Sequence, residues 1–522
     1  MKRSRGVPSA LLLVVIFVFL HSTTPTTGEI PPSEASYNIL MLLPISSRSH
    51  RNVFMPLATA LAARGHKVTM LSNHEAPDQN PKIKYIRHNL DHFKEEEMDM
   101  FAVQKNPSKI FDIFTTVFPL IARDIYDVPV VKELYNKRSE FDLFIVDAIF
   151  NEGSYPFVYG KNFIVLCPGL LDPSQSAVVG NLLNPAYVPN MLADYPRPYS
   201  FITRVKNIFF SLVLPITWRK SIVTPVEAVL KKRFPNLPPL LEIERNQSLT
   251  LINSHFSLGI PLPLLPSQVE IGGMHLRPAK PLPKDIAEVV SGKTPVIYMS
   301  LGSVARSSSM PEHFKKMILA AFARLPYKVI WKFEEEMENL PKNVIIKKWM
   351  PQQDILAHPN VKLFISHCGL LGSQEAMYHG TPILGLPIFG DQPKHAAYLQ
   401  NVGVARYLEW EDLTEQLLVD TIQELVSNPS YRQKMSEYGA KFMDQPESPV
   451  DRAVFWTEYV IRHKGARHMR SAEWSLSWVE LLHLDIALAL HLMVYIIYKI
   501  LRKICSLCCS SSAAKKSKSK RE

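Results

Sequence analysis

Short apolar runs alternate along this chain with longer stretches that carry apolar residues at helical spacing. In the first half, the runs at 37–44, 67–72 and 141–146 are expected to be strands. In the second half, strands are expected at 295–300, 327–333, 343–349, 361–366 and 383–389. Strands that alternate with helices in this way predict α/β domains with doubly wound parallel sheets. Because a body of ~450 residues is too long for one core, two such domains are expected.

The two ends of the chain carry apolar runs of another kind. Basic residues precede the run at 10–20, so residues 1–28 have the form of a secretory signal peptide. Near the other end, 479–501 is long enough to cross a hydrocarbon core of roughly 30 Å as one helix. A buried soluble helix would not explain the basic tail at 502–522. Since basic flanks stay in the cytosol, a single-pass type I protein with a luminal body is expected.

The formal net charge of +11 belongs to these ends. From Lys499 onward, eight Lys and Arg stand against one Glu, and the signal peptide holds three more cations. The body is therefore nearly neutral, which argues against nucleic acid as a partner. Lys518 and Lys520 stand five and three residues from the end, a spacing that resembles a dilysine retrieval signal for the endoplasmic reticulum.

The cysteines and a glycosylation sequon fit this topology. Three cysteines follow the expected membrane helix and are open to acylation: Cys505, Cys508 and Cys509. Cys167 and Cys368 fall in different predicted domains, so two free thiols are expected there rather than a disulfide. Asn246 begins the sequence Asn-Gln-Ser, which is an acceptor for a glycan in the lumen.

The densest set of polar side chains lies in the stretch 349–392. Its central strand, 361–366, ends in His367 and Gly369, and Gly372 with Ser373 is expected to open a helix. The unpaired N–H groups of such a helix start attract an anion, and a diphosphate would suit the site. His367 can donate to the same oxygens.

Flanking residues extend this site toward a nucleotide sugar. Trp349 offers a flat face for a base, and Gln352 is close enough in sequence to bond the base or the ribose. Glu375 is suited to a ribose diol. Asp391 and Gln392 follow the last strand, where open α/β sheets bind ligands, and are suited to sugar hydroxyls. Each of these residue types alone more often has a structural role, so the prediction depends on their occurrence together in one short stretch.

The stretch as a whole follows W-x-P-Q-x-D-x-L-x-H-P, then F-I-x-H-x-G, E-A-x-x-x-G-x-P and P-x-F-x-D-Q. It resembles the signature of the UDP-glycosyltransferases in their animal membrane-bound form. The resemblance implies the glycosyltransferase-B fold, in which two Rossmann-like domains face each other across a cleft. Leu371 stands where many members carry Asn or His, and the Leu-Leu pair is more similar to invertebrate members.

The resemblance also suggests a domain plan. Residues 29–258 would bind the acceptor, the proline-rich 259–290 would link the domains, and 291–445 would bind the UDP-sugar. Residues 446–478 resemble the return helices that pack on the first domain. In the turn after the strand at 295–300, Ser303 can bond a phosphate oxygen.

His50 and Asp147 are the candidate catalytic residues. His50 lies between the first strand and a helix expected at 53–64, where an imidazole can act as a general base. Family members carry a catalytic His sixteen residues before a Gly-His pair, and His50 has that spacing from His66. Asp147, at the carboxyl end of its strand, would orient the ring. Asp142 would lie at the wrong end.

Two apolar segments have no single interpretation from sequence. Residues 91–132 and 187–214 mix aromatic and aliphatic residues with scattered charges. They are suited either to cover the core as amphipathic helices, or to line an apolar acceptor pocket or dip into the membrane.

These features predict inverting transfer of a hexose from a UDP-sugar to a small lipophilic acceptor, without a cofactor or metal. Glucose is the preferred donor, since Asn253 falls near the Arg that glucuronate-using members carry, although His255 or Arg306 could compensate. The alternatives are glucuronosyl transfer and a silent subunit of the same fold. A NAD-type oxidoreductase would need a G-x-G-x-x-G turn that neither first strand has. Acceptor identity and any homo-oligomer stay open.

Overall fold

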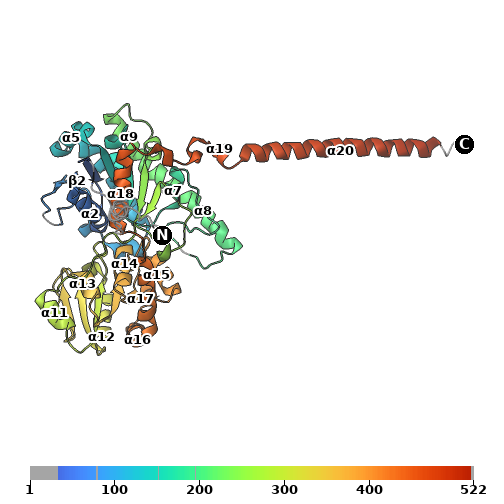
Figure 1. Cartoon of the computed structure of the whole chain (residues 1–522). Helices are drawn as coiled ribbons and strands as arrows, with labels where there is room; N and C mark the ends of the chain where they lie inside the picture. The colour runs from blue at the N-terminus through green and yellow to red at the C-terminus, as the bar shows by residue number, and fades with distance from the viewer. Residues whose placement is uncertain (1–32, 34, 78–79, 151, 194, 519–522) are drawn as a thin grey trace, which may run out of the picture.

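The computed structural model describes residues 33, 35–77, 80–150, 152–193 and 195–518. The expected signal peptide and the last four residues of the retrieval signal lie outside them. The described body contains two parallel sheets, which stand one above the other in Figure 1. The expectation of two doubly wound α/β domains is confirmed.

The first sheet has seven strands in the order β3-β2-β1-β4-β5-β6-β7. Their bounds are β1 Asn38–Leu43, β2 Lys67–Ser72, β3 Ile83–Arg87, β4 Leu143–Asp147, β5 Phe163–Cys167, β6 Leu249–Ile252 and β7 Gln268–Glu270. Its helices are α2 Arg48–Ala63, α3 Met100–Lys105, α4 Ser108–Asp124, α5 Pro129–Asn136, α6 Tyr155–Val158, α7 Pro173–Val178, α8 Phe201–Trp218, α9 Thr224–Arg233 and α10 Leu240–Arg245.

The second sheet has six strands in the order β10-β9-β8-β11-β12-β13. Their bounds are β8 Val296–Ser300, β9 Lys328–Lys332, β10 Val344–Lys347, β11 Val361–Ser366, β12 Ile383–Gly385 and β13 Ala405–Tyr407. Its helices are α11 Lys284–Val290, α12 Glu312–Ala323, α13 Gln352–Leu356, α14 Leu370–Tyr378, α15 Gln392–Asn401, α16 Glu415–Ser427 and α17 Pro429–Met443.

Each sheet separates two apolar layers. In β1, Leu40 and Leu42 face one layer while Met41 and Leu43 face the other, and all four are buried. This alternation is the period of two that an extended strand imposes on its side chains. Strands buried on both faces read as continuous apolar runs, and such runs located β1, β2, β4 and β8 to β12. Strands β3, β5, β6, β7 and β13 were not predicted from the sequence.

Several boundaries differ from the sequence prediction, among them the following three. The strand expected over 383–389 ends at Gly385, because Pro387 cannot donate a ladder hydrogen bond. The helix expected from residue 53 begins at Arg48, because Ser47 caps it. The helix expected from Gly372 begins at Leu370.

The carboxyl-terminal segment returns to the first domain before it leaves the body. Helix α18 (Pro449–Arg462) packs on α2, and the buried carboxylate of Glu458 binds Arg64 and His66. Helix α19 (Trp478–Leu481) follows, and then α20 (Leu484–Lys518) projects away from the body (Figure 1).

Residues Leu484–Ser506 of α20 are long and apolar enough to cross a membrane, and none of that stretch is buried. The membrane helix was expected to begin at residue 479, but α20 begins at Leu484. His483 adopts a φ of 53° and separates α20 from α19. It also continues through the tail as far as Lys518. Cys167 and Cys368 are buried and free, as expected.

Candidate active site

The ring of His50 and the carboxylate of Asp147 form a pair at the carboxyl end of the first sheet. His50 Nδ1 lies 2.8 Å from Asp147 Oδ2, and the Asp147 side chain is only 1% exposed. Ser47 Oγ accepts from the His50 N–H, and Asp147 Oδ1 accepts from the Ile149 N–H. His50 therefore lies in the first turn of α2, not before the helix, and both members of the pair are held by local hydrogen bonds.

Opposing effects set the pKa of His50. Burial by itself lowers the pKa, because it disfavours the charged imidazolium. The charge and hydrogen bond of Asp147 outweigh burial, with smaller contributions from Asp391 and Glu95, and the pKa lies above 6.5. Since a carboxylate only accepts, Nδ1 carries the ring proton and Nε2 is left to take one from a substrate. This is the arrangement of a general base with its orienting carboxylate.

His367, directly after β11, is wedged between two glycines. A Cβ on Gly302 would lie 2.7 Å from a ring carbon, and a Cβ on Gly369 would lie 2.5 Å from Nε2. Between them, Cys368 adopts a φ of 61°, which turns the chain from the strand into α14. Burial lowers the pKa of His367 to about 4, so the ring is neutral at pH 7 and donates through one N–H.

The start of α14 presents unpaired polar groups beside this ring. Ser373 N–H bonds the Gly369 carbonyl at 3.0 Å, but the N–H groups of Leu370 to Gly372 precede the first intrahelical bond. His367 Nδ1 and Ser373 Oγ are buried and have no hydrogen-bond partner within the described part of the chain. Orphaned groups at a helix N-terminus are suited to hold an anion such as a diphosphate.

Gln352 and Glu375, both expected near the ribose, contact one another. Gln352 Nε2 donates to Glu375 Oε2 at 2.6 Å, and the Tyr298 hydroxyl donates to Gln352 Oε1 at 3.3 Å. Burial raises the pKa of Glu375 to about 7, so this carboxyl ionises near neutrality. Trp349 follows β10 and is 72% exposed, which leaves its ring open to a planar ligand.

Asp391 and Gln392 lie at the start of α15. The Gln392 side chain is buried, and its Oε1 accepts from the N–H groups of Ile388 and Phe389. Its oxygen therefore shapes the turn, and its amide nitrogen is the group suited to a sugar hydroxyl. The Asp391 side chain is half exposed, and Ser303 is half buried in the turn after Gly302.

Asp391 relates the two histidines across the domains. Its negative charge raises the pKa of both His50 and His367, which belong to different sheets. Because this effect weakens with distance, Asp391 lies near both rings. Lys394 Nζ also donates to the Asn190 carbonyl at 3.3 Å, which joins α15 directly to the first domain. The carboxyl end of the second sheet thus lies close to the first domain.

A small apolar cavity lies in the first domain next to the turn that carries His50. Its lining includes Ile45, Phe118, Phe150 and the buried carboxyl of Glu152. Burial raises the pKa of Glu152, and the Trp218 indole N–H donates to it at 3.3 Å. Of the two segments left open by sequence, the one that forms α4 contributes to the lining of this cavity.

Three neighbouring residues were missed by sequence reasoning. Glu95 binds Arg48 and affects His50, but a run of glutamates in a loop gave no signal. Lys332 donates to the Gly302 carbonyl. It ends β9 as Asp147 ends β4, so a search for polar residues at the carboxyl ends of strands could have found it. His395 donates to the Cys368 carbonyl at 3.3 Å from inside α15.

Comparison with known proteins decides the family. The family described as "UDP-glucoronosyl and UDP-glucosyl transferase" matches residues 40–519. The chain belongs to the UDP-glycosyltransferase family. UDP-glycosyltransferase UGT5 of Dactylopius coccus is 34% identical over 502 residues, covering 92% of this chain and 95% of that relative. UDP-glucuronosyltransferase 2B14 of Oryctolagus cuniculus is 33% identical and covers 82% and 84%.

Solved structures share the fold of this UDP-glycosyltransferase. The glycosyltransferase VinC, solved in complex with dTDP, has a TM-score of 0.56 at 19% identity and covers 82% of this chain and 100% of that one. LpCGTa, solved in complex with UDP, has a TM-score of 0.52 at 16% identity, covering 85% and 100%. The solved structures show the glycosyltransferase-B fold. The family match and the relatives show that the chain is a UDP-glycosyltransferase.

Two residues that depart from the family pattern have structural roles. Asn253 is fully buried, where its Nδ2 donates to the Pro168 carbonyl and its Oδ1 accepts from the Gly273 N–H. Leu371 packs against an apolar layer of the first domain, and its carbonyl accepts from the His275 ring at 3.2 Å. The Asn253 side chain thus joins the first domain to the linker, and the Leu371 side chain packs one domain on the other.

Asn246 follows α10, and its Oδ1 accepts from Arg470 at 2.5 Å, while Ser248 of the same sequon is buried. Among the described residues, no group of three or more His, Cys, Asp or Glu is placed to hold a metal ion.

Proposed function

We propose that this enzyme transfers glucose, with inversion, from UDP-glucose to the hydroxyl of a small lipophilic acceptor. The observation that carries the proposal is the His50–Asp147 pair. The charge of Asp391 raises the pKa of His50 and also that of His367, which belongs to the other domain. A base on one wall and an anion site on the other hold an alcohol and a nucleotide sugar on opposite sides of the reacting carbon.

The proposed reaction needs one proton transfer. His50 Nε2 removes the acceptor hydroxyl proton as the oxygen attacks the anomeric carbon, and the carbon–phosphate oxygen bond breaks. Asp147 stabilises the imidazolium that forms. The developing charge on UDP is met by His367, Ser373 and the N–H groups at the start of α14, so we propose that no metal takes part.

Trp349, Gln352 and Glu375 are proposed to bind the uridine, and Ser303, Asp391 and Gln392 the phosphates and the hexose. Glucose is preferred over glucuronate because the nearby cations already have acidic partners. Arg306 lies 3.7 Å from Glu335, and Lys332 lies 3.3 Å from Glu334. A second carboxylate would have to compete with these glutamates. The relatives include a UDP-glucosyltransferase and a UDP-glucuronosyltransferase, so their names do not decide between glucose and glucuronate as the donor sugar.

The apolar side chains that line the small cavity between Ile45 and α4 support a lipophilic acceptor. We further propose that α20 anchors the enzyme in the membrane of the endoplasmic reticulum, with the body in the lumen and the basic tail in the cytosol. Conjugation of apolar compounds, as in detoxification, suits this placement.

Purified full-length enzyme incubated with a panel of aliphatic alcohols and either UDP-glucose or UDP-glucuronate tests the proposal. The expected product is a β-glucoside, whose anomeric configuration is read by NMR, formed equally well in the presence of EDTA. An α-linked product, a faster reaction with UDP-glucuronate, or loss of activity with EDTA would each contradict the corresponding part. His50→Ala provides the control for background transfer.

A further inference from the structure

Helix α8 presents its apolar side chains to the outside of the molecule. Ile202, Val205, Phe209, Leu212 and Ile216 are 50% to 63% exposed and recur every three or four residues, so they form one stripe along the helix. Soluble proteins rarely leave so large an apolar patch without a function.

The inward side of α8 is polar instead. Within this helix, all of whose residues are described, Asn207 alone is buried. Its Oδ1 accepts from the Asn190 N–H, and its Nδ2 donates to the carbonyls of Pro185 and Val188. Hydrogen bonds therefore hold α8 to the body, and its apolar stripe is not used in the core. The helix has the polarity of one that faces an apolar medium.

Position relates this stripe to the expected membrane. Figure 1 shows α8 at the edge of the body on the side from which α20 projects. Helix α7 contacts α8, and Gly180 just after α7 lies against Ser471 and Glu473 of the segment that leads to α20. The apolar helix and the anchor are thus attached to the same part of the first domain.

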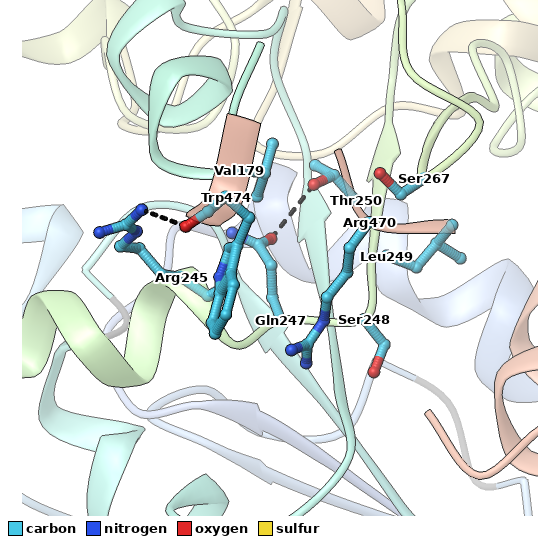
Figure 2. Close-up of a pocket in the computed structure, with 9 residues that line it drawn as sticks. All are labelled: Val179, Arg245, Gln247, Ser248, Leu249, Thr250, Ser267, Arg470 and Trp474. Atoms are coloured by element: carbon cyan, nitrogen blue, oxygen red, sulfur yellow. Dashed lines mark hydrogen bonds between the residues drawn. The ribbon is translucent and has the colours of Figure 1, made fainter. Parts of the chain in front are cut away.

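The segment before the anchor is held in place by a tryptophan between two arginines. Arg245 donates to the Trp474 carbonyl at 3.0 Å, and the guanidinium groups of Arg245 and Arg470 lie 5.9 Å and 5.4 Å from the Trp474 ring centroid (Figure 2). This attachment holds the segment as far as Trp474 on the first domain. The chain therefore leaves the body from the part of that domain to which α8 is also attached.

Charge and exposed aromatic residues agree with a lipid surface. Helix α8 contains Arg204 and Lys206 and no acidic residue, and Lys220 follows it. Trp478 and Val479, close to α20, are also strongly exposed. Cations and tryptophans at the rim of an apolar patch are typical of elements that lie in the headgroup region.

We propose that α8 lies in the leaflet nearest the body, in the membrane that α20 crosses, as a second, non-spanning attachment. The helix ends at Trp218, whose ring stacks on Phe150 at 6.2 Å and donates to Glu152, and both partners line the acceptor cavity. The attached helix thus joins the leaflet to that cavity, and acceptors dissolved in lipid reach the site along it. This inference rests on the proposed anchoring by α20 and the proposed apolar acceptor.

The test uses the full chain in vesicles of phosphatidylcholine with a minority of phosphatidylserine. Cys505, Cys508 and Cys509 are replaced by Ser, while the buried Cys167 and Cys368 stay. One cysteine is then introduced by Phe209→Cys on the stripe, or by Gln423→Cys on the exposed face of α16 as the matched control, and labelled with an environment-sensitive fluorophore.

The expected result at position 209 is a blue-shifted emission that is quenched by spin-labelled lipid and protected from aqueous iodide. The label at 423 should behave in the opposite way. A label at 209 that iodide quenches as at 423 would overturn the inference, and so would protection from both quenchers, which indicates a second copy or another protein over α8. Failure of the chain to float with vesicles would instead overturn the anchoring on which it rests.

A second variant tests the path to the cavity. Phe209→Gln with Leu212→Gln changes only exposed side chains, so folding should be preserved. The apparent KM for a membrane-partitioning alcohol should rise several-fold, while the KM for a water-soluble alcohol, the KM for the UDP-sugar and kcat stay unchanged. An equal change for both alcohols would show that the stripe does not serve delivery from lipid.

Discussion

His50 Nδ1 lies 2.8 Å from Asp147 Oδ2, although 97 residues separate them in the chain. The two meet because β1 and β4 are adjacent and parallel, with Leu42 opposite Val146. The same sheet order puts Asp142 at the opposite edge, where it accepts from the Asn38 N–H. The position of a carboxylate along one strand thus decides whether it can assist the histidine.

Removing either member of the pair should abolish transfer without preventing donor binding. His50→Ala and Asp147→Asn are each expected to lower kcat by about a thousandfold, the usual contribution of an oriented general base. Calorimetry should show unchanged affinity for UDP. Asp142→Asn, directly before the same strand, is the control and should keep nearly full activity. Equal losses for Asp142→Asn and Asp147→Asn would mean that the carboxylates act through folding alone.

Activity should fall on the acid side of neutrality, because His50 must be neutral to accept a proton. Its pKa lies above 6.5, so kcat/KM for an aliphatic alcohol should drop as the pH falls through that raised value. In Asp147→Asn, the main group that raises the pKa is gone and burial still lowers it.

The acid limb of the residual Asp147→Asn activity should therefore move to lower pH. Glu95→Gln should move it in the same direction by less, since its contribution is smaller. An acid limb that stays in place in Asp147→Asn would assign the titration to another group.

A methyl group at Gly369 should weaken UDP binding. Its Cβ would lie 2.5 Å from His367 Nε2, so the ring must leave its place beside α14. We expect Gly369→Ala to raise the Kd for UDP by about tenfold, equivalent to about 1.4 kcal/mol. Gly259→Ala, where a Cβ meets nothing within 4 Å, is the matched control. Unchanged affinity in Gly369→Ala would mean that the ring does not contact the nucleotide.

Glu458 should hold the returning helix α18 on the first domain. Its side chain is 2% exposed and binds Arg64, His66 and Arg462. Glu458→Gln leaves these cations without a counter-charge and should destabilise the contact by about 3 kcal/mol. Hydrogen exchange of α18 amides should accelerate, whereas Glu447→Gln, which breaks a more exposed pair with Arg452, should leave it unchanged.

This contact should also respond to acid. Burial by itself raises the pKa of Glu458, but its bonds to Arg64 and His66 outweigh burial, and the pKa lies below 4.5. A carboxyl with a lowered folded-state pKa contributes stability that is present above 4.5 and lost as the pH falls through the folded value. Exchange of α18 should therefore accelerate only in strong acid, and acceleration near neutrality would point to His66 instead.

The amino-acid sequence by itself determined the strands and the chemistry at their ends. The strands β2 and β11 begin and end where the apolar runs do, because strands buried on both faces must be apolar throughout. Asp147 and His367 could be found as polar residues placed where such runs stop, whereas the choice of His50 also needed the family spacing to His66. That rule is local, so a single chain reveals it.

Only the tertiary structure decided which surfaces are covered. Asn253, which the resemblance places near the Arg of glucuronate-using members, is fully buried and bonds Pro168 and Gly273. Helix α8 turns its apolar stripe outward although its sequence would equally suit a core helix. Periodicity shows which face of a helix is apolar. What covers that face depends on contacts between residues far apart in sequence, as between Glu458 and Arg64, and these form only when the chain has folded.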